Sequence, residues 1–177
     1  VLGIDIRMET GTGKTYCYTR LMYELNKRYG FYKFIVLVPT TPIKEGTRSF
    51  IEADYSKQHF ADLYPGRSIS LSVLNAQKKT KGRKMFPQAI SDFARGTRLE
   101  KNSINALLMS SGMLLPKATM DYDYDQTLFG TFTKPYDTLA ATRPIVIIDE
   151  PHKFKIDNEA YKRLIDRIKP QCVIRFG

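Results

Sequence analysis

The chain has 177 residues, of which 42% are apolar and 26% are charged, so its composition excludes a disordered chain and favours one globular domain with its own core. Its 28 lysines and arginines outnumber 18 acidic residues, and the formal net charge of +10 favours an anionic partner such as nucleic acid over the alternative of a basic domain without one. No apolar run is long enough to cross a membrane and no signal peptide precedes the first motif, so we expect a cytoplasmic protein without a membrane partner.

The first apolar run, residues 2–6, is typical of a strand and leads into the stretch METGTGKT at residues 8–15. This stretch ends like the phosphate-binding loop G-x-x-x-x-G-K-[ST], although Met8 stands where the first glycine is expected. Such a loop turns tightly between a strand and a helix, so that backbone N–H groups and the helix N-terminus face the phosphates. A helical pattern follows at residues 14–29, which favours a P-loop over a chance glycine turn.

The P-loop stretch supplies each group that phosphate binding requires. Gly11 and Gly13 allow a close approach to the backbone, Lys14 would reach the β- and γ-phosphates of ATP, and the Thr15 hydroxyl would bind Mg²⁺. We therefore expect ATP to contact Glu9, Thr10, Gly11, Thr12, Gly13, Lys14 and Thr15, with Lys14 also acting in catalysis.

Strand and helix patterns alternate through the rest of the chain. Strands are expected at residues 33–39, 68–74, 104–110, 144–150 and 171–176, and helices after Thr41 and at residues 87–95, 135–142 and 158–168. Several strands are almost continuously apolar, which is typical of a parallel sheet covered on both faces. The pattern predicts an α/β fold with an open, doubly wound sheet. Residues 78–84, with five positive charges, and residues 120–135, rich in acids and aromatics, are expected to form surface loops.

A second motif, IVIIDEPH at residues 145–152, places two carboxylates at the end of a buried strand. Ligands bind at this end of the strands in open α/β sheets. Asp149 suits the Walker B acid that holds Mg²⁺, and Glu150 suits the catalytic base that orients the attacking water. An acidic pair after an apolar strand is a weak signal alone, but together with a P-loop it indicates nucleotide hydrolysis.

The P-loop and the DEPH sequence together resemble superfamily 2 helicases and translocases of the DEAD/DEAH-like type, whose first motif tolerates a residue other than glycine at the position of Met8. The runs GKTYCYTRLMYELNKRYGFYKFIVLVPTTPIKEG and RPIVIIDEPHKF are similar to the Res subunit of type III restriction–modification enzymes. The resemblance implies a RecA-like P-loop NTPase with helices on both faces of a mostly parallel sheet. Residues 1–177 would then form the first motor domain of a longer chain, with a second motor domain and a nuclease domain elsewhere.

The same resemblance implies a set of residues that communicate with DNA. His152 occupies the position that couples the ATP site to DNA, and the VPTTPIKEG run matches the second helicase motif. The implied contacts to the nucleic-acid backbone are Thr40, Thr41, Ser110, Ser111 and Gly112. Thr40 and Thr41 have an alternative role, since threonine is also a favoured cap of a following helix.

The resemblance also implies the function: an ATP- and Mg²⁺-dependent motor that moves on double-stranded DNA in a prokaryotic cytoplasm, with the Mod methyltransferase subunit as its partner. The alternatives are another superfamily 2 helicase, a type I restriction motor subunit, or a nucleotide-dependent DNA-binding module that does not hydrolyse ATP. Nuclease activity is not expected, because no acidic residue of the chain is followed two positions later by lysine.

The cysteines, the second histidine and the chain ends give weaker signals. The cysteines, Cys17 and Cys172, fall in a helical and a strand pattern, so we expect buried, reduced thiols. No Cys/His spacing suggests a zinc site, and His59 is expected to be an ordinary surface or helix histidine. The chain begins with Val1 and ends within a strand pattern, so we expect it to be a piece of a longer polypeptide.

Overall fold

The computed structural model describes all residues except 77–81, 83, 97–102, 126–130 and 155–157. Its centre is a single six-stranded sheet in the order β1-β6-β5-β2-β4-β3, and every neighbouring pair of strands is parallel. The strands are β1 (Leu2–Ile6), β2 (Lys33–Val38), β3 (Ser68–Val73), β4 (Ser103–Ser110), β5 (Ile145–Asp149) and β6 (Cys172–Phe176). The strand predictions are confirmed, with ends that differ by at most one residue.

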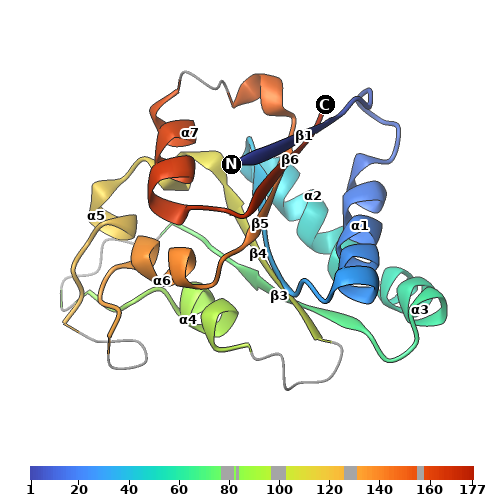
Figure 1. Ribbon diagram of the computed structural model, residues 1–177, viewed down its shortest axis with the longest axis horizontal. Helices are drawn as coiled ribbons and strands as arrows, with labels where there is room; N and C mark the ends of the chain where they lie inside the picture. The colour runs from blue at the N-terminus through green and yellow to red at the C-terminus, as the bar shows by residue number, and fades with distance from the viewer. Residues whose placement is uncertain (77–81, 83, 97–102, 126–130, 155–157) are drawn as a thin grey trace.

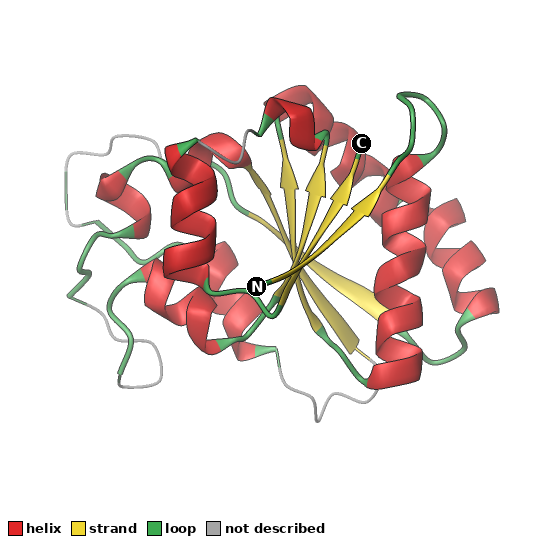
Figure 2. Ribbon diagram, turned by 45° about the horizontal axis from the view of Figure 1, so that its top comes forward, coloured by secondary structure: helices red, strands yellow, loops and turns green. Residues whose placement is uncertain are grey.

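Helices connect the strands and form a layer on each face of the sheet (Figures 1 and 2). The α-helices are α1 (Lys14–Tyr29), α2 (Thr41–Glu52), α3 (Asp54–Leu63), α4 (Gln88–Arg95), α5 (Lys117–Met120), α6 (Pro135–Ala141) and α7 (Glu159–Arg163). Short 3₁₀ turns follow β4 (η1, Ser111–Leu114) and β5 (η2, Pro151–Lys153), and α7 continues as a π-helical turn (η3, Leu164–Ile168).

The central strand β2 shows why both faces must be covered. Its side chains alternate, so that Ile35 and Leu37 enter one core cluster while Phe34, Val36 and Val38 enter the other, and all five are buried. Side chains of α1 and α3 contribute to the second cluster, and those of α4, α6 and α7 to the first. The predicted α/β fold with helices on both faces of a parallel sheet is therefore confirmed.

The ends of α1 and α2 follow from their sequences. Gly13 and Gly30 bracket α1 with left-handed backbone, at φ 87° and 75°. The Thr40 hydroxyl accepts a hydrogen bond from Ile43 N at 3.4 Å, and Pro42 occupies the first turn of α2. Thr40 is therefore a helix cap, as its alternative role predicted.

Helix α3 has no counterpart among the sequence predictions. Its sequence, DYSKQHFADL, buries only Ser56 and Phe60, so its apolar stripe is too narrow to stand out. The helix is held by aromatic packing, because the ring of Phe60 stacks on Tyr23 of α1 with centroids 4.9 Å apart. His59 lies exposed on this helix, as expected.

The surface-loop prediction for residues 120–135 is wrong at Met120 and Tyr124, which are 0% and 1% exposed. Met120 belongs to a core cluster, and the Tyr124 ring packs edge-on against Phe86. Burial of these large apolar surfaces outweighs the polarity of the neighbouring acids. Of the basic run 78–84, only Gly82 and Lys84 lie among the described residues, and both are exposed.

Candidate nucleotide-binding site

The carboxyl ends of β1, β5 and β6 bring the two sequence motifs together. Glu150 N donates to Phe176 O at 3.0 Å, so the DEPH turn is attached to β6. Gly177 N donates to Ile6 O at 3.0 Å, and Met8 N donates to Gly177 O at 3.3 Å, so the start of the P-loop is attached to the same strand end. Segments more than a hundred residues apart in the sequence therefore meet at one edge of the sheet, as parallel topology predicts.

The P-loop has the open backbone that phosphate binding requires. Gly11 and Gly13 adopt φ values of 80° and 87°, and an added Cβ at either position would meet nothing within 4 Å. Backbone conformation, rather than space, therefore requires glycine here. The loop is closed by Thr12, whose N–H and hydroxyl both donate to Glu9 O, at 3.3 and 2.5 Å. The half-buried Met8 side chain packs against the core, which explains an apolar residue at this position.

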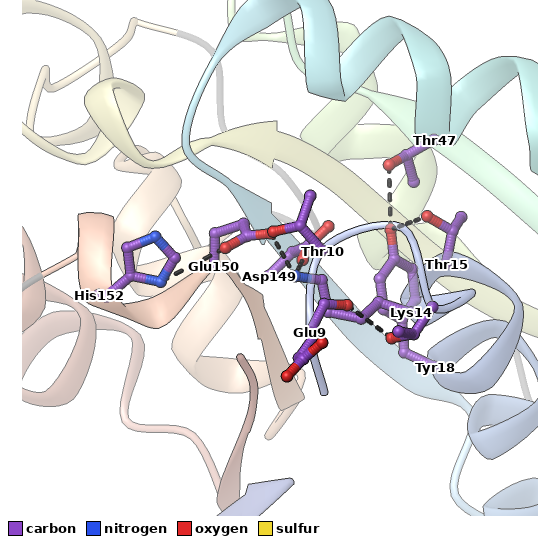
Figure 3. A network of polar contacts seen from close by, with 10 residues as sticks. Glu9, Thr10, Lys14, Thr15, Tyr18, Thr47, Asp149, Glu150 and His152 are labelled. Carbon is purple, nitrogen blue, oxygen red and sulfur yellow. Dashed lines mark hydrogen bonds and ion pairs between the residues drawn. The ribbon is translucent and has the colours of Figure 1, made fainter. Parts of the chain in front are cut away.

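Lys14 is buried against the acids of the second motif (Figure 3). Its ammonium donates a hydrogen bond to Glu150 Oε1 and lies 4.0 Å from Asp149 Oδ1. The Thr10 hydroxyl donates to the same Glu150 oxygen at 3.4 Å. Lys14 and Glu150, which were expected to act on phosphate and water respectively, thus form an ion pair in this structure.

Asp149 carries an unsatisfied oxygen. The residue is 5% exposed, and its Oδ1 has no hydrogen-bond partner among the described residues. Burial raises the pKa of Asp149, an effect that Lys14 opposes and Glu150 reinforces. A buried carboxylate oxygen without a hydrogen bond is unfavourable, and carboxylate oxygens are preferred ligands of Mg²⁺. The residues present therefore fit the expected metal, with Asp149 and the half-buried Thr15 as the groups that would hold it.

Glu150 has a strained backbone and a lowered pKa. Its φ of 54° is left-handed although it is not glycine, and such a conformation costs about 1–3 kcal/mol. The hydrogen bond from Lys14 is the main cause of the lowered pKa, against the opposing effect of burial. His152, at 63% side-chain exposure, places Nδ1 3.3 Å from Glu150 Oε2. Glu150 therefore lies between the P-loop lysine and an exposed histidine.

A pocket of about 630 Å³ lies beside this pair, where the P-loop begins. It is lined by Arg7, Met8, Glu9, Thr10, Glu150, His152 and Gly177. The lining joins both motifs to the end of β6, so the pocket opens at the edge of the sheet where ligands of parallel α/β proteins bind.

Tyr18 is a site residue that the sequence motifs did not reveal. Its fully buried hydroxyl donates to Thr15 Oγ1 at 3.3 Å and lies 3.0 Å from Thr47 Oγ1 of α2 (Figure 3). Burial is the main cause that raises its pKa to about 12, so the hydroxyl stays protonated at neutral pH. The available signal was its spacing, since a residue three positions after Thr15 lies on the same helix face.

The expected nucleic-acid contacts lie at the ends of two neighbouring strands. Thr40 and Thr41 follow β2, whereas Ser110 is the last residue of the neighbouring strand β4, and Ser111 and Gly112 follow it. Thr40, Thr41 and Gly112 are exposed, whereas Ser110 and Ser111 are half-buried. The fold thus brings these residues to the same edge of the sheet as the P-loop.

Cys17 and Cys172 are free thiols, and both are half-buried rather than buried as expected. Within the described part of the chain, no group of three or more His, Cys, Asp and Glu side chains could hold a metal ion. In the same part, every helix is too short or too polar to cross a membrane. Mg²⁺ typically binds one or two carboxylates together with substrate phosphates, so a protein cage is not required for the site at Asp149.

Comparison with known proteins identifies the family. A family model described as "Type III restriction enzyme, res subunit" matches residues 3–177. The chain belongs to this family. It is 49% identical over 176 residues to the StyLTI Res subunit of Salmonella typhimurium, and 42% identical over 177 residues to the EcoPI and EcoP15I Res subunits of Escherichia phage P1 and Escherichia coli. Each alignment covers 98% of this chain but 18% of the relative.

The family assignment confirms the resemblance to Res subunits and agrees with the RecA-like P-loop fold seen in the six-stranded parallel sheet. The chain spans about a fifth of the length of these Res relatives.

Proposed function

We propose that the chain binds Mg-ATP between the P-loop and the DEPH turn, and that it hydrolyses ATP as the first motor domain of a DNA translocase. One observation carries the proposal: Lys14, at the start of α1, faces two buried acids at the end of β5, and one of them, Asp149, has an oxygen without a hydrogen-bond partner among the described residues. Mg-ATP would supply opposite charges for both groups, because the cation would bind the Asp149 carboxylate and the phosphates would bind the Lys14 ammonium.

Lys14 and the two acids would divide the chemistry between them. Phosphate oxygens compete with Glu150 for the Lys14 ammonium, and when Lys14 turns to the phosphates the Glu150 carboxylate is released to accept a proton from the attacking water. Asp149 and Thr15 would hold Mg²⁺. When bound, Mg²⁺ supplies positive charge that neutralises the phosphate oxygens. The pair between Lys14 and Glu150 therefore keeps the base occupied until a nucleotide enters.

Hydrolysis by this chain alone is expected to be slow. P-loop motors gain about 10³–10⁵ in rate from an arginine finger, which in this family is expected from a second motor domain. The experiment that tests the function is a steady-state ATPase assay on the full-length Res polypeptide with DNA present. Turnover that disappears in Asp149→Asn supports a motor, and nucleotide binding without any turnover would instead indicate a non-hydrolysing DNA-binding module.

The relatives are Res subunits of restriction–modification enzymes. We therefore propose double-stranded DNA as the track, a Mod methyltransferase subunit as the partner, and the prokaryotic cytoplasm as the location. Within the chain, the residues at the carboxyl ends of β2 and β4, of which Thr40, Thr41 and Gly112 are exposed, would contact the DNA backbone. His152 would couple the two sites, since it is exposed and lies 3.3 Å from Glu150.

DNA binding by the chain should be sequence-independent and sensitive to salt. The net charge of +10 attracts phosphates, and binding to phosphates releases counterions. We expect affinity for a fluorescent duplex to fall roughly 100-fold between 50 and 200 mM salt, as about three or four phosphate contacts would give. Two duplexes of unrelated sequence should bind equally well. Fluorescence anisotropy titrations measure both, and an affinity that salt leaves unchanged would contradict the prediction.

A further inference from the structure

Tyr18 connects the P-loop helix to α2, and the proposed hydrolysis does not use it. Its ring packs edge-on against Phe176, with centroids 5.8 Å apart, which fixes the hydroxyl in place. The hydroxyl lies between Thr15 Oγ1, at 3.3 Å, and Thr47 Oγ1, at 3.0 Å (Figure 3). Both helices are fully described, and within them the Tyr18–Thr47 bond is the one side-chain hydrogen bond that joins α1 to α2.

The two ends of this hydroxyl chain belong to different sites. Thr15 lies in the nucleotide site, whereas Thr47 is buried in the middle of α2, the helix that begins at Thr41 beside the proposed DNA contacts. Helix α2 is held at a second point by the Lys44 ammonium, which donates to Leu74 O at 3.3 Å and to the Asn75 side chain at 2.8 Å. Among the described residues, a change at Thr47 therefore changes one of two side-chain polar attachments of α2.

The direction of the hydrogen bonds depends on Thr15. A phenol has a single proton to donate, so while Tyr18 donates to Thr15 it must accept from Thr47. A hydroxyl that binds a cation turns its lone pairs toward the cation and its proton away. Thr15 would then donate to Tyr18, and Tyr18 would donate to Thr47. Occupation of Thr15 would therefore change Thr47 from the donor to the acceptor of its hydrogen bond with Tyr18.

We propose that Tyr18 is a positioning residue that couples occupation of the nucleotide site at Thr15 to the attachment of α2 at Thr47, and so to DNA affinity at Thr40 and Thr41. The inference rests on the proposed function, because it requires both a nucleotide and a DNA site. Coupling between two sites is a measurable ratio of affinities, typically about 5- to 150-fold.

The test measures, in the purified chain, the ratio of the DNA affinity with a bound nucleotide to the DNA affinity without one. Anisotropy of a fluorescent DNA duplex gives the DNA affinity with Mg²⁺ alone and with Mg²⁺ plus a non-hydrolysable ATP analogue. The ratio should be at least about fivefold in the unmodified chain and close to one in Tyr18→Phe and in Thr47→Val. The double variant should show no further change, because both substitutions interrupt the same chain of hydroxyls. Omitting Mg²⁺ should also remove the coupling.

Tyr136→Phe is the matched control. Tyr136 is also fully buried and its hydroxyl donates to Leu114 O, but it belongs to the core cluster on the other face of the sheet. Tyr136→Phe removes only this hydroxyl. The substitution should lower the midpoint of thermal unfolding about as much as Tyr18→Phe does and should leave the coupling ratio unchanged. Should Tyr18→Phe fail to fold, Thr47→Val decides alone.

Two results would overturn the inference while leaving the proposed function standing. One is a normal ratio in Tyr18→Phe or Thr47→Val, and the other is a ratio near one in the unmodified chain although both ligands bind. Failure of the unmodified chain to bind the ATP analogue at all would instead contradict the proposed function itself, and the inference with it.

Discussion

Replacing Glu150 by glutamine should leave ATP bound and unhydrolysed. Glutamine keeps the shape of the side chain but cannot accept a proton from water, and loss of a general base typically lowers rates about 10²–10⁴-fold. Asp149 remains in place for the metal. Because the carboxylate that now holds Lys14 disappears, nucleotide affinity should rise rather than fall. Single-turnover hydrolysis and calorimetric titration of ATP in the full-length Res polypeptide measure the two effects.

Glu52→Gln is a suitable control, since Glu52 pairs with Arg48 on the exposed surface of α2 and touches neither motif. It should hydrolyse ATP at the normal rate. If Glu150→Gln loses ATP binding, or hydrolyses ATP as fast as the control, Glu150 does not act as the base. Loss of ATP binding in Glu150→Gln would instead indicate that Glu150 helps to bind phosphate or metal.

Replacing Lys14 by alanine should have the opposite effect on binding. Hydrogen bonds to charged groups contribute about 1.5–3 kcal/mol, so nucleotide affinity should fall roughly 10- to 100-fold. Competition with a fluorescent ADP analogue measures this. Lys14→Ala with normal affinity would show that the P-loop lysine does not reach the phosphates.

The same variant should be less stable at neutral pH, because two buried acids lose their cation. The lowered pKa of Glu150 sets the pH range of this effect. A lowered folded-state pKa contributes stability that is present above the unfolded pKa and is lost as the pH falls through the folded value. The stability difference between the unmodified chain and Lys14→Ala should therefore be largest near pH 7 and shrink below about pH 4. Urea unfolding at several pH values checks the trend.

Local pattern was sufficient for most of the fold. Short apolar runs, several of them nearly continuous, identified every strand, and the helical pattern at residues 14–29 identified α1. Sequence patterns did not predict the helix or the buried side chain that depend on tertiary contacts. Phe60 stabilises α3 by stacking on Tyr23, and Tyr124 is buried beside Phe86 within a stretch that is locally polar. Neither contact leaves a periodic signal in the sequence.

The site was predictable to the level of motifs. Carboxyl ends of parallel strands meet at one edge, so Lys14 and Asp149 were expected to be near each other, and they are 4.0 Å apart. The ion pair between Lys14 and Glu150 and the bridge through Tyr18 depend on side-chain geometry that no motif encodes. The left-handed backbone of Glu150 is likewise invisible in the sequence, because this conformation is rare outside glycine.

Calorimetric titration of an ATP analogue into the purified chain, with Mg²⁺ and after its removal by a chelator, tests the central claim most directly. A site formed by the P-loop and the DEPH turn predicts saturable binding of one nucleotide that weakens when Mg²⁺ is removed. It also predicts that Asp149→Asn, which removes the charge of the unsatisfied carboxylate, binds with Mg²⁺ as weakly as the unmodified chain does without it. Equal affinity with and without Mg²⁺ in the unmodified chain, or no saturable binding at all, would contradict a metal–nucleotide site at these two motifs.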